Sequence, residues 1–224
     1  MPGISNVIRT HHVDRWLWVY MPYTIMIFNF LTNLIVSTFT GPYTSGGVMS
    51  IYVFMMTLGI IVVPMNFSFL LGFGVRRKDY YSGTVIWLTV HMLVASIVLA
   101  VLRAIEKATS WGTGLGFFNF PFTNELGFLE FLALNFVVFT FFCFFGFLLP
   151  SIARRFGALV LAGLIVLMFV VLGIASVLVT FYELWDEVGR FFATHQTESI
   201  WYLAPFTLLF VVMAYFLLRR STVK

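Results

Sequence analysis

Long apolar runs separated by short polar or glycine-containing connections extend along the whole chain. A helix that crosses the hydrocarbon core of a bilayer, about 30 Å thick, needs roughly 20 mainly apolar residues. Six runs reach this length, at residues 17–38, 48–72, 83–104, 127–149, 157–181 and 200–218. No run is left for a separate soluble domain, so the pattern predicts an all-α membrane protein in which residues 1–224 form a single transmembrane domain.

The composition supports a membrane protein and excludes an ordinary soluble domain. Hydrophobic residues make up 61% of the chain and charged residues only 10%, whereas a soluble domain carries about 25% charged residues. Lipid is therefore the expected surrounding of most side chains. The single cysteine, Cys143, lies in an apolar run, so neither a disulfide framework nor a cysteine-rich metal site is expected.

Basic residues are distributed unevenly between the two sides that the six spans define. Ten of the 13 Lys and Arg residues fall on the side of the two chain ends, and three fall on the other side, Arg103, Lys107 and Arg190. Short cytoplasmic loops of membrane proteins carry an excess of Lys and Arg. Both termini are therefore expected in the cytoplasm, and the basic charge is explained by the bilayer as partner, with no nucleic acid.

Three connecting segments have a character of their own. Residues 1–16 are polar and run into Trp16 and Trp18, which predicts a short interfacial helix before the first span. Residues 105–126 carry several glycines and aromatic residues and are expected to be irregular. Residues 182–198 repeat charged and apolar positions at helical spacing, which predicts a short amphipathic helix on the outer surface.

The sequence offers little for catalysis. Neither HExxH nor GxSxG occurs, and no pair of aspartates lies within the spans. His91 is the one histidine inside a span, so a haem held by two histidines of the membrane interior would need a second chain. Glu130, near the outer end of the fourth span, is expected to reach the headgroups. No catalytic residue and no metal site is therefore predicted.

Neutral polar residues within the spans permit two interpretations. Asn29, Thr32 and Asn33 share one face of the first span by their spacing, and Asn66 lies in the second span. These side chains would line a substrate path, or they would form hydrogen bonds between neighbouring helices. The sequence does not separate the two.

The basic connection after the second span is the most informative segment. It reads Gly74-Val75-Arg76-Arg77-Lys78-Asp79-Tyr80-Tyr81-Ser82-Gly83, a basic cluster with glycines at both ends. Glycines permit tight chain reversals, so a short charged protrusion is expected here. Such a protrusion suits docking to another protein, although it would also serve as an anchor that keeps this side of the chain in the cytoplasm.

In this segment the chain resembles the permease subunits of the type-2 ABC exporter superfamily, whose small six-span bacterial members carry a similar glycine-flanked segment between spans two and three. The resemblance covers nearly the whole chain, because the interfacial N-terminal segment, the six spans and the outer segment before the last span also agree. It implies that Val75, Arg76, Arg77, Lys78, Asp79, Tyr80 and Tyr81 form the coupling helix, which docks on a separate ATPase subunit.

The resemblance also implies the partners and the location. ATP and Mg would be bound by the ATPase, since GxxxxGK[ST] is absent from this chain. A second permease chain, identical or homologous, would complete the transporter in a bacterial cell membrane, and the cargo would be an amphiphile such as a peptide, a lipid or an antibiotic. The alternatives are a small channel and a six-span anchor or assembly subunit of a redox or other membrane complex. A copurifying ATPase or a haem absorbance band would distinguish them.

The uneven distribution of basic residues generates a prediction about topology. Single cysteines or tags near residues 5, 78, 154 and 222 should be reached only from the cytoplasmic side, and those near 44, 112 and 192 only from outside. Labelling in intact cells with a reagent that does not cross membranes measures this. If a label reached position 78 from outside, the six-span topology would be wrong.

Overall fold

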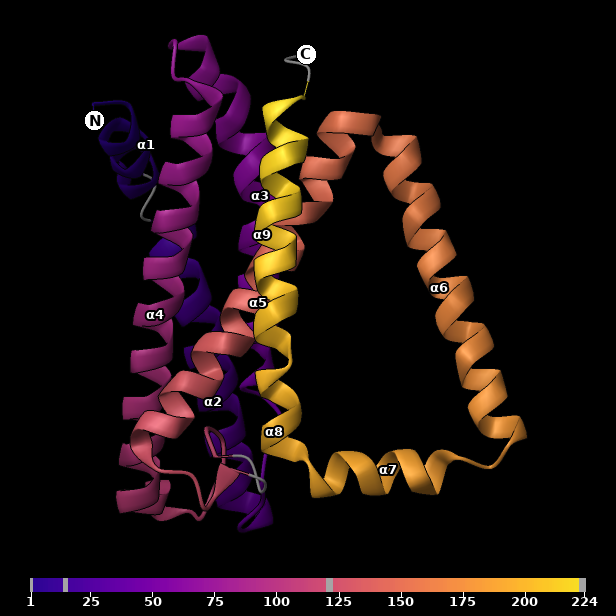
Figure 1. The fold of residues 1–224 in the computed structure, drawn as a ribbon. Coiled ribbons are helices and arrows are strands. Elements are labelled where there is room, and N and C mark those ends of the chain that lie inside the picture. Colours follow the sequence, from indigo (N-terminus) through magenta and orange to yellow (C-terminus); the bar gives the residue numbers. More distant parts are fainter. Residues whose placement is uncertain (1, 14–15, 120–122, 222–224) are drawn as a thin grey trace.

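The computed structural model describes residues 2–13, 16–119 and 123–221 and is a bundle of long helices (Figure 1). Within these described residues, six helices are long enough and apolar enough to cross a membrane, and the structure is 85% helical. The predicted all-α architecture with six spans is therefore confirmed. The spans are formed by the π-helical turn Trp16–Tyr20 with α2 (Met21–Thr40), by α3 (Met49–Gly72), α4 (Arg77–Thr109), α5 (Phe128–Phe156) and α6 (Ala158–Phe181), and by α8 (Gln196–Trp201) with α9 (Leu203–Arg219).

Two spanning helices are longer than their apolar runs. α4 begins at Arg77 instead of residue 83 and ends at Thr109, and α5 continues to Phe156. An apolar run stops at the first charged residues, but a helix tolerates them, and the ends of these two helices favour them electrostatically. Asp79 lies in the first turn of α4, and Arg154 and Arg155 lie in the last turn of α5.

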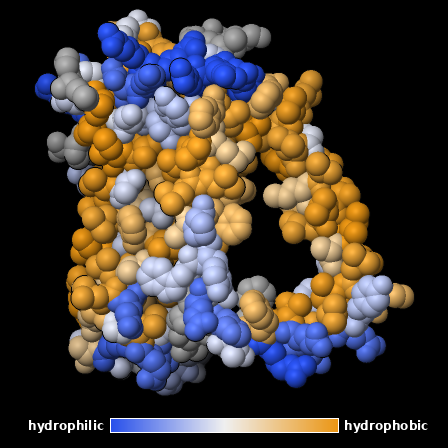
Figure 2. Space-filling model, viewed as in Figure 1, coloured by the Kyte–Doolittle hydropathy of each residue, from blue (hydrophilic) through white to orange (hydrophobic). Residues whose placement is uncertain are grey.

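The two predicted helices outside the spans are also present. α1 (Pro2–Val13) precedes the first span, and α7 (Trp185–Thr194) lies within residues 182–198. Figure 1 shows α7 joining the end of α6 to α8, roughly perpendicular to α9. In Figure 2 its outer surface is hydrophilic, as expected for an amphipathic helix at a membrane surface.

The central contact of the bundle joins α3 to α5 through two glycines. A β-carbon on Gly59 would clash with the backbone oxygen of Cys143, and a β-carbon on Gly146 would clash with that of Met56. Small residues allow two membrane helices to approach at backbone distance, which gains dispersion energy that lipid cannot replace. Around this contact Met55, Leu58, Val62, Phe139 and Phe147 are fully buried.

α6 stands away from the rest of the bundle. None of its 24 residues is buried, and Figure 1 shows it leaning outward from α5 to α7, with open space toward α9. Figure 2 shows the same opening between apolar surfaces. A helix that is apolar all round and makes so few contacts is stable only where lipid or another apolar surface surrounds it.

The two ends of the bundle are polar and differ in what they contain. Both chain ends, the α3 to α4 turn and the α5 to α6 turn lie at one end, and α7 lies at the other end with the segment that follows α4 (Figure 1). At the first end, side chains of Arg77 and Arg155 donate hydrogen bonds to the backbone oxygens of Arg219 and Arg220 at 3.1 and 2.5 Å. We call this end the basic end.

The glycine contact generates a prediction about stability. Gly59→Ala or Gly146→Ala should destabilise the protein by about 1–3 kcal/mol, because α3 and α5 must move apart to admit a methyl group. Gly173→Ala is the matched control, since no atom lies within 4 Å of a β-carbon there and alanine favours the helix by about 1 kcal/mol. Thermal unfolding in detergent measures the difference. Equal melting temperatures for Gly59→Ala and Gly173→Ala would contradict this account of the core.

Candidate functional site

The N-terminal helix α1 is fixed to the start of α4. Val7 is fully buried, and a β-carbon on Gly83 would lie 2.8 Å from the Val7 β-carbon. The same helices approach near Asp79, whose carboxylate would be 2.6 Å from a β-carbon on Gly3. The missing side chains of Gly3 and Gly83 thus allow α1 to lie directly against α4.

His11 of α1 completes this attachment through hydrogen bonds to two other helices. Its Nε2 lies 3.2 Å from the Thr84 hydroxyl of α4, and its Nδ1 lies 3.2 Å from the amide nitrogen of Asn66 in α3. Since an amide nitrogen only donates, Nδ1 accepts and Nε2 carries the proton. The imidazole is almost completely buried, and this burial lowers the pKa of His11 to about 4.

A stack of three aromatic rings extends from His11 along α4. The Trp87 ring lies between the two imidazoles, with its centroid 4.9 Å from that of His11 and 5.4 Å from that of His91. Trp18, from the turn before α2, meets Trp87 edge-on at 4.7 Å. The two histidines that the sequence placed in different parts of the chain therefore lie on either side of one indole.

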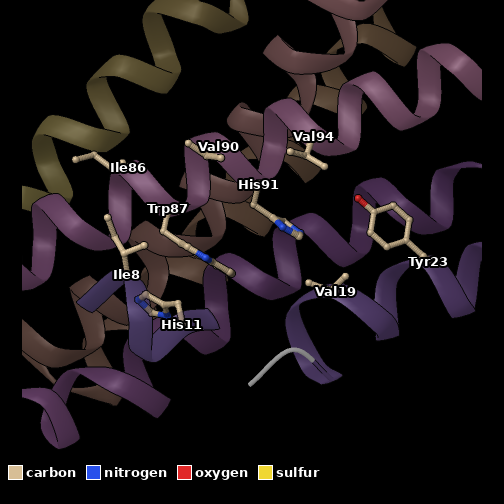
Figure 3. A pocket seen from close by; sticks show the side chains of 9 residues that line it. All are labelled: Ile8, His11, Val19, Tyr23, Ile86, Trp87, Val90, His91 and Val94. Carbon is tan, nitrogen blue, oxygen red and sulfur yellow. The ribbon is translucent and has the colours of Figure 1, made fainter. Parts of the chain in front are cut away.

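A pocket of about 320 Å³ opens beside this stack. Figure 3 shows the pocket between α1, α4 and the start of α2, with the Tyr23 ring facing His91 across it. Its other walls are aliphatic. The lining residues are Ile8, His11, Val19, Tyr23, Ile86, Trp87, Val90, His91 and Val94. We call it the His91 pocket.

His91 carries a buried polar atom in this pocket that has no hydrogen-bond partner among the described residues. The side chain is 9% exposed, and its Nε2 is buried without a hydrogen-bond partner in the described part of the chain. A buried polar atom without a partner costs about 1–3 kcal/mol. His91 was expected to be the one histidine within a span, but its neighbourhood with His11 could not be read from the sequence.

The four residues predicted to line a substrate path do not lie in one place. Asn33 is the centre of a hydrogen-bond network in which its amide nitrogen donates to Asn29, and Tyr43 and Ser45 donate to its oxygen at 2.9 and 2.5 Å. Thr32 is exposed and donates to the backbone of its own helix. Asn66 binds His11 at the basic end. The structure thus brings together only Asn29 and Asn33.

The predicted coupling segment, Val75 to Tyr81, forms a tight turn and the first turn of α4. Gly74 adopts a left-handed conformation with φ of 80°, Arg76 is extended, and the helix begins at Arg77. Arg76 and Lys78 are exposed. The segment therefore presents a turn and the start of a helix, with Arg76 and Lys78 as exposed basic side chains.

The two tyrosines of that segment face the chain's own helices. Tyr80 is fully buried and donates a hydrogen bond to the backbone oxygen of Val62 in α3 at 3.3 Å. The Tyr81 hydroxyl donates to the backbone oxygen of Val211 in α9 at 2.5 Å. Both rings attach α4 to its neighbours and are not accessible to another protein.

At the opposite end, Glu106 and Arg103 organise the irregular segment after α4. One carboxylate oxygen of Glu106 accepts hydrogen bonds from the Trp111 indole and from the backbone N–H groups of Phe117 and Phe118, each at 2.9 Å. The Arg103 guanidinium donates to Asn119 at 3.1 Å and lies 4.1 Å from the ring centroid of Phe131.

This cluster was not predicted, although its members are charged and aromatic residues in one stretch of sequence. Glu106 is only 4% exposed, although it lies in a stretch of sequence that also carries Arg103 and Lys107. Glu130, expected to reach the headgroups, accepts a hydrogen bond from the backbone of Gly127 at 3.1 Å and caps α5. Among the described residues, no group of three or more metal-binding side chains occurs.

Comparisons with protein-family models, with curated proteins and with solved structures find no match to this chain.

The buried imidazole generates a prediction about pH. His11 stays neutral in the folded protein down to about pH 4, whereas in the unfolded chain it takes up a proton below about pH 6.5. The stability from the neutral imidazole is thus complete above about pH 6.5 and is lost as the pH falls toward 4. By linkage, lowering the pH from 7.5 to 5 should weaken the attachment of α1 by about 2 kcal/mol.

Hydrogen exchange of the α1 amides, corrected for intrinsic rates, measures this effect. His11→Gln is the matched variant, because glutamine keeps a donor and an acceptor but has no proton to gain. Its α1 should exchange equally at both pH values. A parent protein whose corrected exchange does not change between pH 7.5 and 5 would contradict the role of His11.

Proposed function

We propose that this chain is the permease subunit of an ABC exporter and that it works with a separate ATPase subunit. The observation that carries the proposal is the α3 to α4 turn, which holds the segment resembling the coupling region of type-2 ABC permeases. In Figure 1 this turn lies at the basic end and extends beyond the ends of α5, α6 and α9. A partner that approaches the basic end would meet it first.

The exposed side chains of the turn suit a docking contact. Phe73 is 74% exposed, and it lies between Gly72 and Gly74, which have no side chain to cover it. Arg76 and Lys78 point outward next to it. Interfaces typically combine a central aromatic anchor with surrounding charges, so Phe73 takes the anchoring role that the buried Tyr80 and Tyr81 cannot have.

The helices that meet at the turn provide a route for mechanical coupling. α4 is a continuous helix of 33 residues, about 50 Å long at the usual rise. α3 is joined to α5 by the glycine contact, so displacement of the turn would move both α4 and the α3 to α5 pair. In this proposal the ATPase binds ATP and Mg, a second permease chain forms the other wall of the path, and an amphiphile is the cargo.

The turn generates a prediction about assembly. Phe73→Ala should weaken binding of the ATPase by about 2 kcal/mol or more, which is the usual loss for an aromatic anchor. The double change Arg76→Glu with Lys78→Glu should weaken it by a similar or larger amount through loss of charge pairing. The measurement is the amount of ATPase that copurifies with the tagged chain from native membranes, together with the ATP hydrolysis of the complex.

Matched controls separate docking from folding and insertion. Phe39→Ala removes a phenylalanine that is also highly exposed, at 86%, and lies near the last residue of α2. This variant should not change assembly. Topology must be measured in the charge-reversed variant, because the change also weakens the signal for orientation. If correctly inserted Phe73→Ala and charge-reversed chains copurify the same amount of ATPase as the parent, the docking site is wrong. If no ATPase copurifies with the parent, the permease proposal itself fails.

A further inference from the structure

We infer that the His91 pocket binds a neutral amphiphile that carries carbonyl oxygens on a flat conjugated ring, the chemistry of a quinone. The pocket is defined by the nine residues given above and lies between α1, α4 and the start of α2 (Figure 3). This inference rests on the geometry of the pocket alone and does not depend on the permease proposal.

The hydrogen-bonding groups of the pocket wall require a ligand that accepts. The Trp87 indole carries only a donor, and the Tyr23 hydroxyl carries a donor that can rotate. Neither group forms a hydrogen bond within residues 2–13, 16–119 and 123–221, and His91 Nε2 is unpartnered there as well. A neutral imidazole adds one more N–H. Three donors thus surround one space, and a ligand with two carbonyl oxygens would satisfy them.

The two histidines of the pocket differ in their hydrogen bonds. His11 lines the same pocket but has a partner on each ring nitrogen, Thr84 and Asn66. His11 therefore holds α1 in place and closes one side of the pocket. His91 lies on the far side of Trp87, and its ring nitrogen remains available for a hydrogen bond to a ligand in the pocket.

The charge and shape of the walls select the ligand class further. The remaining lining residues, Ile8, Val19, Ile86, Val90 and Val94, are aliphatic, and the described lining contains no charged side chain. A charged headgroup would lose its hydration there without a counterion, which is costly. The Tyr23 ring offers an aromatic surface to a flat ring, whereas the two faces of Trp87 are covered by the imidazoles of His11 and His91. The aliphatic walls suit an apolar tail that continues into the bilayer.

The experiment uses the full chain in lipid nanodiscs and ubiquinone-1, a benzoquinone with one isoprenoid unit, as the probe. Quenching of tryptophan fluorescence should saturate with added quinone, because Trp87 lies in the pocket wall. His91→Phe and Tyr23→Phe should each weaken binding roughly five- to tenfold, the usual effect of losing one hydrogen bond. The matched controls are His195→Phe and Tyr202→Phe, which change residues between α7 and α9 that do not line the pocket. They should leave binding unchanged.

A second probe separates specific binding from the filling of an apolar space by lipid. The dimethoxybenzene analogue of ubiquinone-1 has the same ring substituents and tail on a flat six-membered ring but no carbonyl oxygen, and it should bind at least tenfold more weakly. Because Tyr23→Phe removes a single oxygen atom, it keeps the test decisive even if His91→Phe does not fold. Quenching that does not saturate, equal binding by parent and Tyr23→Phe, or equal binding of the two probes would each overturn the inference.

Discussion

The close approach of α3 and α5 at Gly59 and Gly146 is the contact on which the rest of the bundle depends. In a bilayer the hydrophobic effect does not drive helices together, because lipid tails are as apolar as the side chains they would replace. Two backbones in direct contact gain what lipid cannot supply, namely close dispersion contacts along several turns. The other spanning helices then pack around this pair, apart from α6.

Polar groups specify the arrangement that packing alone would leave loose. An unsatisfied polar group costs several kcal/mol in the bilayer interior. Each buried polar side chain must therefore lie next to a hydrogen-bond partner, which restricts how the helices can pack. Tyr52 pairs with Asn135 across α3 and α5, Tyr81 binds the α9 backbone, and Glu106 gathers the segment after α4. Together they fix α3 against α5, α4 against α9, and the segment after α4 against the end of that helix.

The sequence predicted the number and approximate limits of the spans, because the length of an apolar run depends on the bilayer and not on tertiary contacts. It also predicted α1, from a polar segment that runs into Trp16 and Trp18, and α7, from charged and apolar residues at helical spacing. The sequence did not predict the surroundings of side chains whose partners lie in other segments of the chain. The buried setting of Glu106 arises from backbone N–H groups of a later segment, and the pairing of His11 with Asn66 joins residues 55 positions apart.

The tyrosines after Arg77 show why such residues are hard to interpret from sequence. A glycine-flanked basic segment with two aromatic residues is typical of a docking loop. The same sequence pattern is also compatible with the first turn of a helix whose aromatic rings pack against neighbouring helices. What distinguishes them is the direction of each side chain, which depends on where the helix begins. With α4 beginning at Arg77, Tyr80 and Tyr81 face α3 and α9, and Arg76 and Lys78 face outward.

The helix α4 carries the exposed turn at its beginning and residues of the His91 pocket further along. Arg77 and His91 are 14 residues apart in one unbroken helix, which is about 21 Å at the usual rise. The opposite wall of the pocket belongs to the first span, which contributes few buried residues to the bundle. A partner that tilts α4 by its exposed turn would therefore move Trp87 and His91 relative to Tyr23, while the glycine contact holds α3 and α5 together. Occupancy of the pocket and docking at the basic end would then influence each other, since any ligand that prefers one position of α4 shifts the population toward it.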